Sequence, residues 1–129
     1  MASERREVAS GTEWEETVGY SRAVRAGDQV HVAGTTAVDE DGEPMDAGPH
    51  EQARRALALV TDALRAAGAE PEQVVRTRAF VTDADDWEAV GRAHAEAFGD
   101  AQPAMTLVEV AALVDPRLCV EFEATAVLR

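Results

Sequence analysis

The sequence contains no lysine, and all 12 of its basic residues are arginine. Without lysine the chain cannot form a Schiff base with a carbonyl substrate through a side-chain amine. Its 25 acidic residues give a formal net charge of −13 at pH 7, so its field repels the phosphates of nucleic acids and anionic lipid headgroups. We therefore expect neither nucleic acid nor a membrane as a partner.

Cysteine and long apolar runs are also scarce. Cys119 is the single cysteine, so no internal disulfide and no cysteine pair for a structural zinc is available. The three histidines are scattered and lack cysteine partners, and we expect no metal and no cofactor. No apolar run approaches the ~18 residues of a membrane span, and the charged N-terminus lacks the apolar centre of a secretory signal. These features predict a cytoplasmic protein.

The length of 129 residues fits one domain. Residues 1–17 are polar and acidic, and we expect them to form an N-terminal arm or an edge strand. Residues 18–129 then form a single domain. Alternating residues predict strands at 20–25 and 29–34, joined by a tight turn at Ala26-Gly27-Asp28.

Two amphipathic helices are predicted further along the chain. The first begins at Pro49 and ends at Gly68, which is a natural helix stop. The second follows Asp83 or Asp85 and ends before Gly99; its expected apolar stripe consists of Trp87, Val90, His94 and Phe98. The remaining strands are expected at 74–82, 104–113 and 118–128.

This order of elements predicts an α+β fold, in which two helices pack on one face of a single mixed β-sheet. The chain has no second helical layer for the other face. Apolar residues expected there, with Met105, Leu107 and Val127 as candidates, predict that this face is buried against another copy of the protein.

No local catalytic motif is present, so a site would be assembled from scattered residues at strand ends or between subunits. Glu121 and Glu123 lie two apart on the last predicted strand, and their carboxylates therefore leave the same face. Their mutual repulsion would raise the pKa of one and make it a usable acid or base. The alternative is that both are solvated glutamates on a sheet edge.

Six segments in a specific order suggest a family. They are Gly19–Val24 (GYSRAV), Val32–Thr35 (VAGT), Val74–Asp83 (VVRTRAFVTD), Trp87–Phe98, Pro103-Ala104 and Val120–Ala124 (VEFEA). Together they resemble the Rid family, also called YjgF or reactive intermediate deaminase and formerly L-PSP endoribonuclease. The resemblance implies a YjgF-like, chorismate-mutase-like homotrimer, whose sheets face a barrel-like centre and which binds a small molecule in a cleft at each subunit interface.

The resemblance also implies roles for individual residues. In the deaminase members a tyrosine and a glutamate of these motifs help to place a water that hydrolyses an imine or enamine, and Tyr20 and Glu121 occupy those positions. The other motif positions implied to bind the substrate are Gly34, Thr35, Trp87, Gly91, Met105 and Thr106.

This chain departs from the family pattern at the residue that holds the substrate carboxylate. Deaminase members have arginine where this chain has Met105, and many have asparagine where it has Gly91. Losing the cationic half of a buried carboxylate pair costs ~2–5 kcal/mol. We therefore expect a less charged or larger apolar substrate, with Arg22 or Arg92 as a substitute cation.

Three functions follow, in decreasing order of expectation. The first is a cofactor-independent, deaminase-like hydrolase of imines, enamines or related carbonyl-derived intermediates. The second is a non-catalytic trimer that binds a small molecule or has a regulatory role. The third, ribonuclease activity, ranks last because the chain is so acidic.

Overall fold

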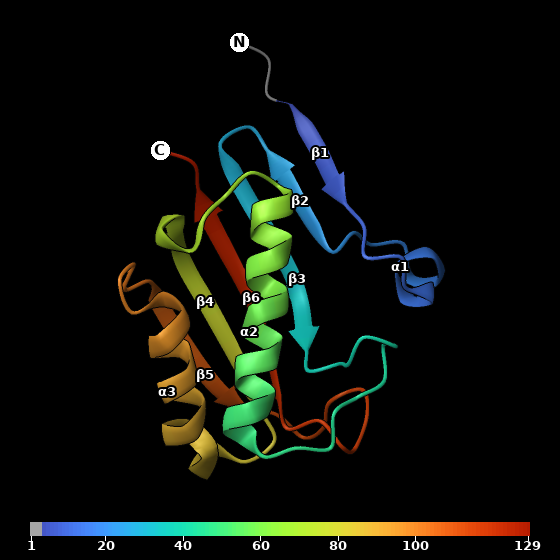
Figure 1. The fold of residues 1–129 in the computed structure, drawn as a ribbon, viewed down its shortest axis with the longest axis vertical. Helices are drawn as coiled ribbons and strands as arrows, with labels where there is room; N and C mark the ends of the chain where they lie inside the picture. The colour runs from blue at the N-terminus through green and yellow to red at the C-terminus, as the bar shows by residue number, and fades with distance from the viewer. Residues whose placement is uncertain (1–3) are drawn as a thin grey trace.

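A computed structural model describes residues 4–129. One six-stranded sheet with the order β1-β2-β3-β6-β4-β5 forms its centre (Figure 1). The strands are β1 (Arg5–Val8), β2 (Ala23–Ala26), β3 (Gln29–Thr36), β4 (Val74–Val81), β5 (Ala104–Glu109) and β6 (Val120–Val127). The β4–β5 pair is parallel and the other pairs are antiparallel, so the sheet is mixed.

Two long helices, α2 (Pro49–Ala66) and α3 (Trp87–Phe98), cover one face of this sheet. Three short helices complete the chain: α1 (Glu13–Val18), η1 (Pro71–Gln73) and η2 (Ala84–Asp86). This is the α+β arrangement that the sequence predicts. None of the helices in the described part of the chain is long and apolar enough to cross a membrane.

Local sequence explains where the long helices begin and end. Pro49 stands at the first turn of α2, where its missing N–H costs nothing. Gly68, at φ +92°, follows the end of that helix in a conformation that other residues rarely adopt. Before α3, the Asp83 side chain accepts a hydrogen bond of 2.9 Å from the Asp85 N–H and caps η2.

The core lies between the helices and the sheet. Alternate residues of β6 point into it, and Phe122 is fully buried there with Leu57 and Leu64 of α2 and Phe98 of α3. Trp87 does not join this core, contrary to the predicted stripe: its side chain is 59% exposed. It is the first residue of α3, before the first full turn that packs on the sheet.

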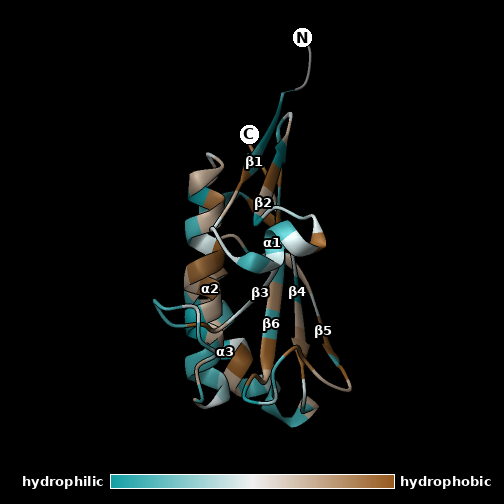
Figure 2. Cartoon of the chain, turned by 90° about the vertical axis from the view of Figure 1, so that its right-hand side faces the viewer, coloured by the Kyte–Doolittle hydropathy of each residue, from teal (hydrophilic) through white to brown (hydrophobic). Residues whose placement is uncertain are grey.

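Figure 2 shows the sheet with α2 and α3 on one side and no helix over the other. Two residues predicted for this open face lie on the opposite one. Met105 pairs with the buried Thr77 and Leu107 with the buried Ala79, and both pack against the core beneath the helices. Of the three candidates only Val127, which alternates with the buried Ala126, lies on the open face.

Residues 4–18 contain both an edge strand and a helix, and residues 1–3 of the predicted arm lie outside the described residues. β1 pairs antiparallel with β2 at the edge of the sheet. The chain then turns into α1, which ends at Gly19 with φ +84°. α1 lies beyond the end of β2, at the side of the sheet (Figure 1).

Gln52 of α2 ties two loops to the core. Its side chain is fully buried, and its Nε2 donates to the carbonyls of Met45, Ala47 and Arg117 at 2.8–3.1 Å. Its Oε1 accepts a hydrogen bond of 2.9 Å from the Cys119 N–H. One amide therefore fixes both the loop that follows β3 and the loop that precedes β6.

Candidate functional site

The candidate site lies where β2 stops short of the end of β3. The two strands pair as far as Ala23 and Val32, and the last backbone link joins Ala33 N–H to the Arg22 carbonyl at 2.9 Å. Beyond it, β3 keeps a neighbouring strand only on its β6 side. A groove of about 900 Å³ occupies this end of the sheet, bounded by the α1 region, α2 and the two loops that Gln52 holds.

Arg22 fills the place that a longer β2 would take. Its Nη1 donates to the Gly34 carbonyl at 2.8 Å and to Thr35 Oγ1 at 3.0 Å. Its Nη2 donates to the Tyr20 hydroxyl at 3.2 Å, and its guanidinium carbon lies 5.6 Å from the centre of the Tyr20 ring. These contacts hold a positive charge on the floor of the groove.

Glu121 of β6 brings a carboxylate to the same groove. It pairs with Thr36 on one side and Phe80 on the other, so it belongs to a central strand and is only partly exposed. Burial raises the pKa of Glu121 above its ordinary value and the Glu123 carboxylate raises it further, while Arg22 opposes the rise. No side-chain hydrogen bond within residues 4–129 engages this carboxylate.

The two glutamates predicted to act as a pair have different partners. Glu123 forms an ion pair with Arg78, at 2.9 Å between Oε1 and Nη1. Glu121 has no such partner within the described residues. The repulsion inferred from their spacing is present, but burial is the larger cause of the raised pKa. The alternative of solvated glutamates on a sheet edge is wrong, because β6 is an inner strand.

Gly34 makes room for the Glu121 carboxylate. A Cβ atom at position 34 would overlap Glu121 Oε2 and lie 3.1 Å from Glu121 Cδ. The Glu121 carboxylate can therefore keep this position only while residue 34 has no side chain.

The structure brings together five of the ten predicted site residues. Tyr20, Arg22, Gly34, Thr35 and Glu121 all line the groove. The other five residues do not line it: Trp87, Gly91 and Arg92 belong to α3, and Met105 and Thr106 belong to β5.

The residues on β5 have partners of other kinds. Met105 packs against the core beneath the helices. The Thr106 hydroxyl accepts a hydrogen bond of 2.8 Å from Arg76 Nη2. A role for either residue in binding a ligand stays a prediction.

Sequence reasoning missed the wall formed by α1. Glu15 is buried there, and its carboxylate accepts hydrogen bonds from Ser10, through both the N–H and the hydroxyl, and from the Thr12 hydroxyl. Burial raises the pKa of Glu15, but the hydrogen bonds from Ser10 and Thr12 and the charge of Arg22 outweigh it, and the pKa lies below its ordinary value. The T-x-x-E spacing of Thr12 and Glu15 is a helix-start signal that would have revealed α1.

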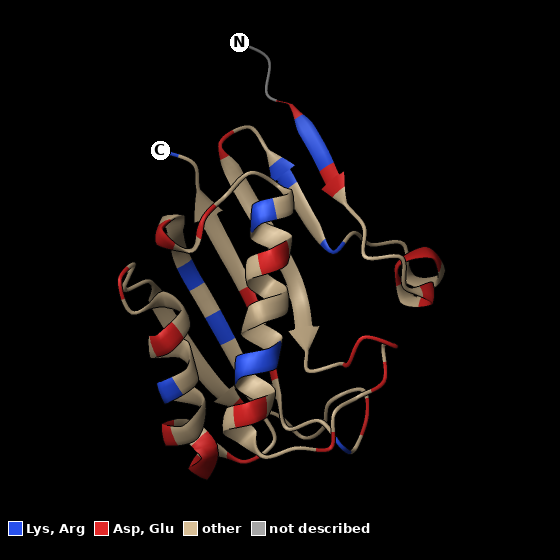
Figure 3. Ribbon diagram, in the orientation of Figure 1, with Lys and Arg blue, Asp and Glu red and all other residues tan. Residues whose placement is uncertain are grey.

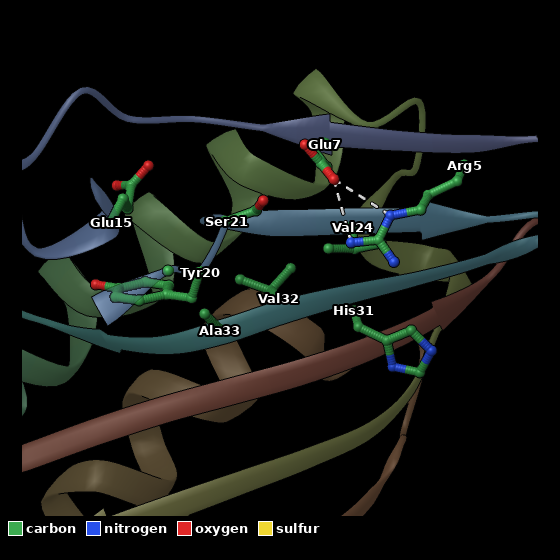
Figure 4. Close-up of a pocket in the computed structure, with 10 residues that line it drawn as sticks. Arg5, Glu7, Glu15, Tyr20, Ser21, Val24, His31, Val32 and Ala33 are labelled. Carbon is green, nitrogen blue, oxygen red and sulfur yellow. Dashed lines mark hydrogen bonds and ion pairs between the residues drawn. The ribbon is translucent and has the colours of Figure 1, made fainter. Parts of the chain in front are cut away.

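A second hollow of about 560 Å³ lies beside the first, along β1, β2 and β3. Figure 4 shows its lining, with the ion pair of Arg5 and Glu7 at 3.2 Å on one side and His31 on the other. Tyr20 lines both hollows and therefore stands between them.

Acidic residues dominate the outer rim of the larger groove. Figure 3 shows them along the loop that follows β3, where Asp39, Glu40 and Glu43 line the groove. They do not form a metal centre: within residues 4–129 no three His, Cys, Asp or Glu side chains are grouped closely enough to hold a metal ion.

Comparisons with known proteins agree on one group of relatives. The sequence model described as "Endoribonuclease L-PSP" matches residues 11–128. An uncharacterized protein of Streptomyces coelicolor is 42% identical over 121 residues, which cover 94% of this chain and 90% of that protein. A mouse protein named 2-iminobutanoate/2-iminopropanoate deaminase is 34% identical over 98% of this chain and 95% of its own.

Solved structures give the same result. The Mycobacterium tuberculosis protein Rv2704, described as a member of the YjgF/YER057c/UK114 family, has a TM-score of 0.87 and 48% identity, over 96% of this chain and 99% of that one. The YjgF gene product of E. coli has a TM-score of 0.79 and 30% identity, over 99% of this chain and 97% of that one.

Proposed function

Because the chain belongs to the Rid/YjgF family, the family of the endoribonuclease L-PSP model, we propose that it is a cofactor-independent hydrolase of imines, enamines or related carbonyl-derived intermediates. The observation that carries this proposal is the Glu121 carboxylate, which is partly buried, has a raised pKa and lies beside Arg22 and Tyr20 in one groove. A raised pKa makes a carboxylate a stronger base and so favours its use in proton transfer.

The proposed reaction is hydrolysis of a C=N bond. The Glu121 carboxylate takes a proton from a water molecule, whose oxygen forms a bond to the imine carbon. The resulting acid returns that proton to the nitrogen and gives a carbinolamine. Glu121 then takes the proton of the new hydroxyl and passes it to the nitrogen, so that the C=O bond forms, the C–N bond breaks, and a carbonyl compound and ammonia leave. Tyr20, held by Arg22, positions the water or the substrate through its hydroxyl.

We also propose that the protein acts as a homotrimer whose clefts lie between subunits. Support comes from the sheet face that no helix covers and from five predicted site residues that lie away from Glu121 within one chain. Residues of α3 and β5 would then take part in the site only through a neighbouring copy.

A non-catalytic binding role is the second candidate. Position 105 supports it, because Met105 provides no cation and packs against the core. Ribonuclease activity, which the family description names, ranks below both. The groove carries Asp39, Glu40, Glu43 and Asp62, and RNA phosphates would be repelled by them.

Ammonia release separates these candidates. Imines generated in situ from 2-aminobutanoate and from neutral amines are supplied to the purified protein, to Glu121→Gln and to Glu88→Gln, which removes one exposed carboxylate on α3. We expect the wild type and Glu88→Gln to accelerate hydrolysis and Glu121→Gln to lose at least about 100-fold of that rate. Ligand binding without turnover by the wild type would favour the binding role. RNA cleavage that Glu121→Gln abolishes would favour a ribonuclease.

A further inference from the structure

Arg22 is one of two arginines, with Arg55, that line the groove without forming an ion pair among residues 4–129. Six arginines form ion pairs with carboxylates: Arg5, Arg54, Arg65, Arg78, Arg117 and Arg129. Arg22 has no carboxylate oxygen within 4.0 Å among residues 4–129, although acidic residues outnumber arginines two to one in the chain. Its positive charge is therefore available to a ligand.

The guanidinium of Arg22 is fixed in place and still has protons to donate. Its three hydrogen bonds use both protons of Nη1 and one of Nη2. The Nε proton and the second Nη2 proton have no partner within the described residues. Nε and Nη2 lie along one edge of the guanidinium plane, which is an edge that matches the two oxygens of a carboxylate.

We propose that Arg22 binds the carboxylate of the substrate and so makes this chain selective for carboxylate-bearing substrates, in place of the cation missing at position 105. This assignment rests on the proposed function, because it takes the groove beside Glu121 as the substrate site. The carboxylate lies on Arg22, and the C=N group of the same molecule faces the Glu121 carboxylate. The sequence alone left Arg22 and Arg92 as equal candidates.

The positions of the other unpaired arginines favour Arg22. Four of them line neither hollow: Arg6, Arg25, Arg76 and Arg92, the last of which is exposed on α3. Arg55 does line the groove, but it projects from α2 beside the acidic rim, and its Nε donates to the Val38 carbonyl at 2.7 Å. Arg22 is the arginine whose charge acts on Glu121, so an anion bound to it lies close to the reacting carboxylate.

The net charge of −13 does not oppose this assignment strongly. At physiological salt, charges separated by more than about 8 Å are largely screened, whereas hydrogen bonds to a guanidinium act at contact. The expectation of a less charged substrate rests on the missing cation at position 105. It takes no account of a cation already held in the groove by its hydrogen bonds.

Equilibrium binding tests the proposal without requiring turnover. The probe is 2-oxobutanoate, compared with its neutral amide 2-oxobutanamide, measured by calorimetry on the full-length protein. We expect the wild type to bind the acid more tightly than the amide. Arg22→Gln should weaken acid binding about 10- to 100-fold and leave amide binding nearly unchanged. Arg65→Gln removes the same charge from an exposed ion pair at the end of α2 and should change neither value.

Several results would overturn the assignment. These are equal affinity of the wild type for acid and amide, binding of neither compound, or an acid preference that is lost in Arg55→Gln or Arg92→Gln and kept in Arg22→Gln. If Arg22→Gln fails to fold, Arg22→Lys keeps the charge without the two-pronged edge, and it should retain only part of the acid preference. Acid-selective binding that depends on Arg22, with no turnover, would support the Arg22 assignment and refute the hydrolase. Turnover without any preference for the acid would support the hydrolase and refute the Arg22 assignment.

Discussion

At Gly34 the backbone of β3 passes directly beside the Glu121 carboxylate, and both residues line the candidate site. The atom that would meet a new side chain here is the far end of Glu121, which can rotate away. The surrounding backbone need not move. Stability and activity should therefore respond differently to a substitution at this position.

Gly34→Ala should displace the Glu121 carboxylate, because a Cβ atom occupies its place. We expect turnover to fall at least about tenfold, since small misplacements of a reacting group are costly. The free energy of unfolding should change by less than about 1 kcal/mol. Imine hydrolysis and urea denaturation measure the two effects.

Gly48→Ala is the matched control for this substitution. A Cβ atom at Gly48 meets nothing within 4 Å, and this residue lies outside both hollows. Its turnover should equal that of the wild type. An active Gly34→Ala, or one that unfolds, would show that the close approach to Glu121 does not govern activity.

The raised pKa of Glu121 also predicts a pH-dependent cost in stability. The folded protein binds the Glu121 carboxyl proton more tightly than the unfolded chain does. This proton therefore stabilises the fold fully below the ordinary pKa of 4.5, and the stabilisation is lost as the pH rises through the pKa of the folded protein. Glutamine does not titrate, so Glu121→Gln does not lose stability in this way as the pH rises. We therefore expect Glu121→Gln to gain stability relative to the wild type between pH 4.5 and pH 7, measured by thermal unfolding. A constant difference between the two proteins across that range would contradict the prediction.

At the scale of elements, Gln52 makes α2 the support of both loops that bound the groove. Gln52→Leu leaves buried carbonyls and the Cys119 N–H without partners. We expect the free energy of unfolding to fall by about 3 kcal/mol, because each unsatisfied buried group costs about 1–3 kcal/mol. Gln29→Leu, at an exposed position of β3, should change it by less than about 0.5 kcal/mol. Equal changes in the free energy of unfolding for the two variants would show that Gln52 does not support these loops.

Periodicity and turn residues were sufficient to predict the β2–β3 hairpin, both long helices and the α+β class. They could not assign faces on β5. Alternation shows that Met105 and Leu107 share a face, but the parallel register with Thr77 and Ala79 decides which face, and that register is not local information.

The candidate site was predictable where its residues belong to motifs, as Tyr20 and Glu121 do. The contact of Arg22 with Gly34 and Thr35 was not predictable, because it depends on where β2 begins. The wall formed by α1 was missed because a helix of six residues has almost no periodicity to detect.

At the scale of the whole molecule, the proposed trimer must bring together chains that each carry −13. Light scattering should give a mass about three times the 13.8 kDa of one chain, and added salt should strengthen assembly by screening the repulsion. Val108→Asp places a charge on the open face of β5, where Val108 pairs with Phe80, and should reduce the mass.

Ala58→Asp is the control, because Ala58 is exposed on α2, over the other face of the sheet. It should leave the mass unchanged. A wild-type protein that is monomeric at micromolar concentration, or a Val108→Asp variant that keeps the full mass, would contradict packing through the open face.

The late start of β2, at Ala23, has a consequence for how this protein can change. One wall of the groove is made by the short helix α1 and the side chain of Arg22, neither of which belongs to the buried core between α2, α3 and the central strands. Substitutions, insertions or deletions in the α1 region would therefore reshape the ligand space while the buried core stays intact. The N-terminal segment is an exchangeable part, through which one scaffold can be adapted to new ligands.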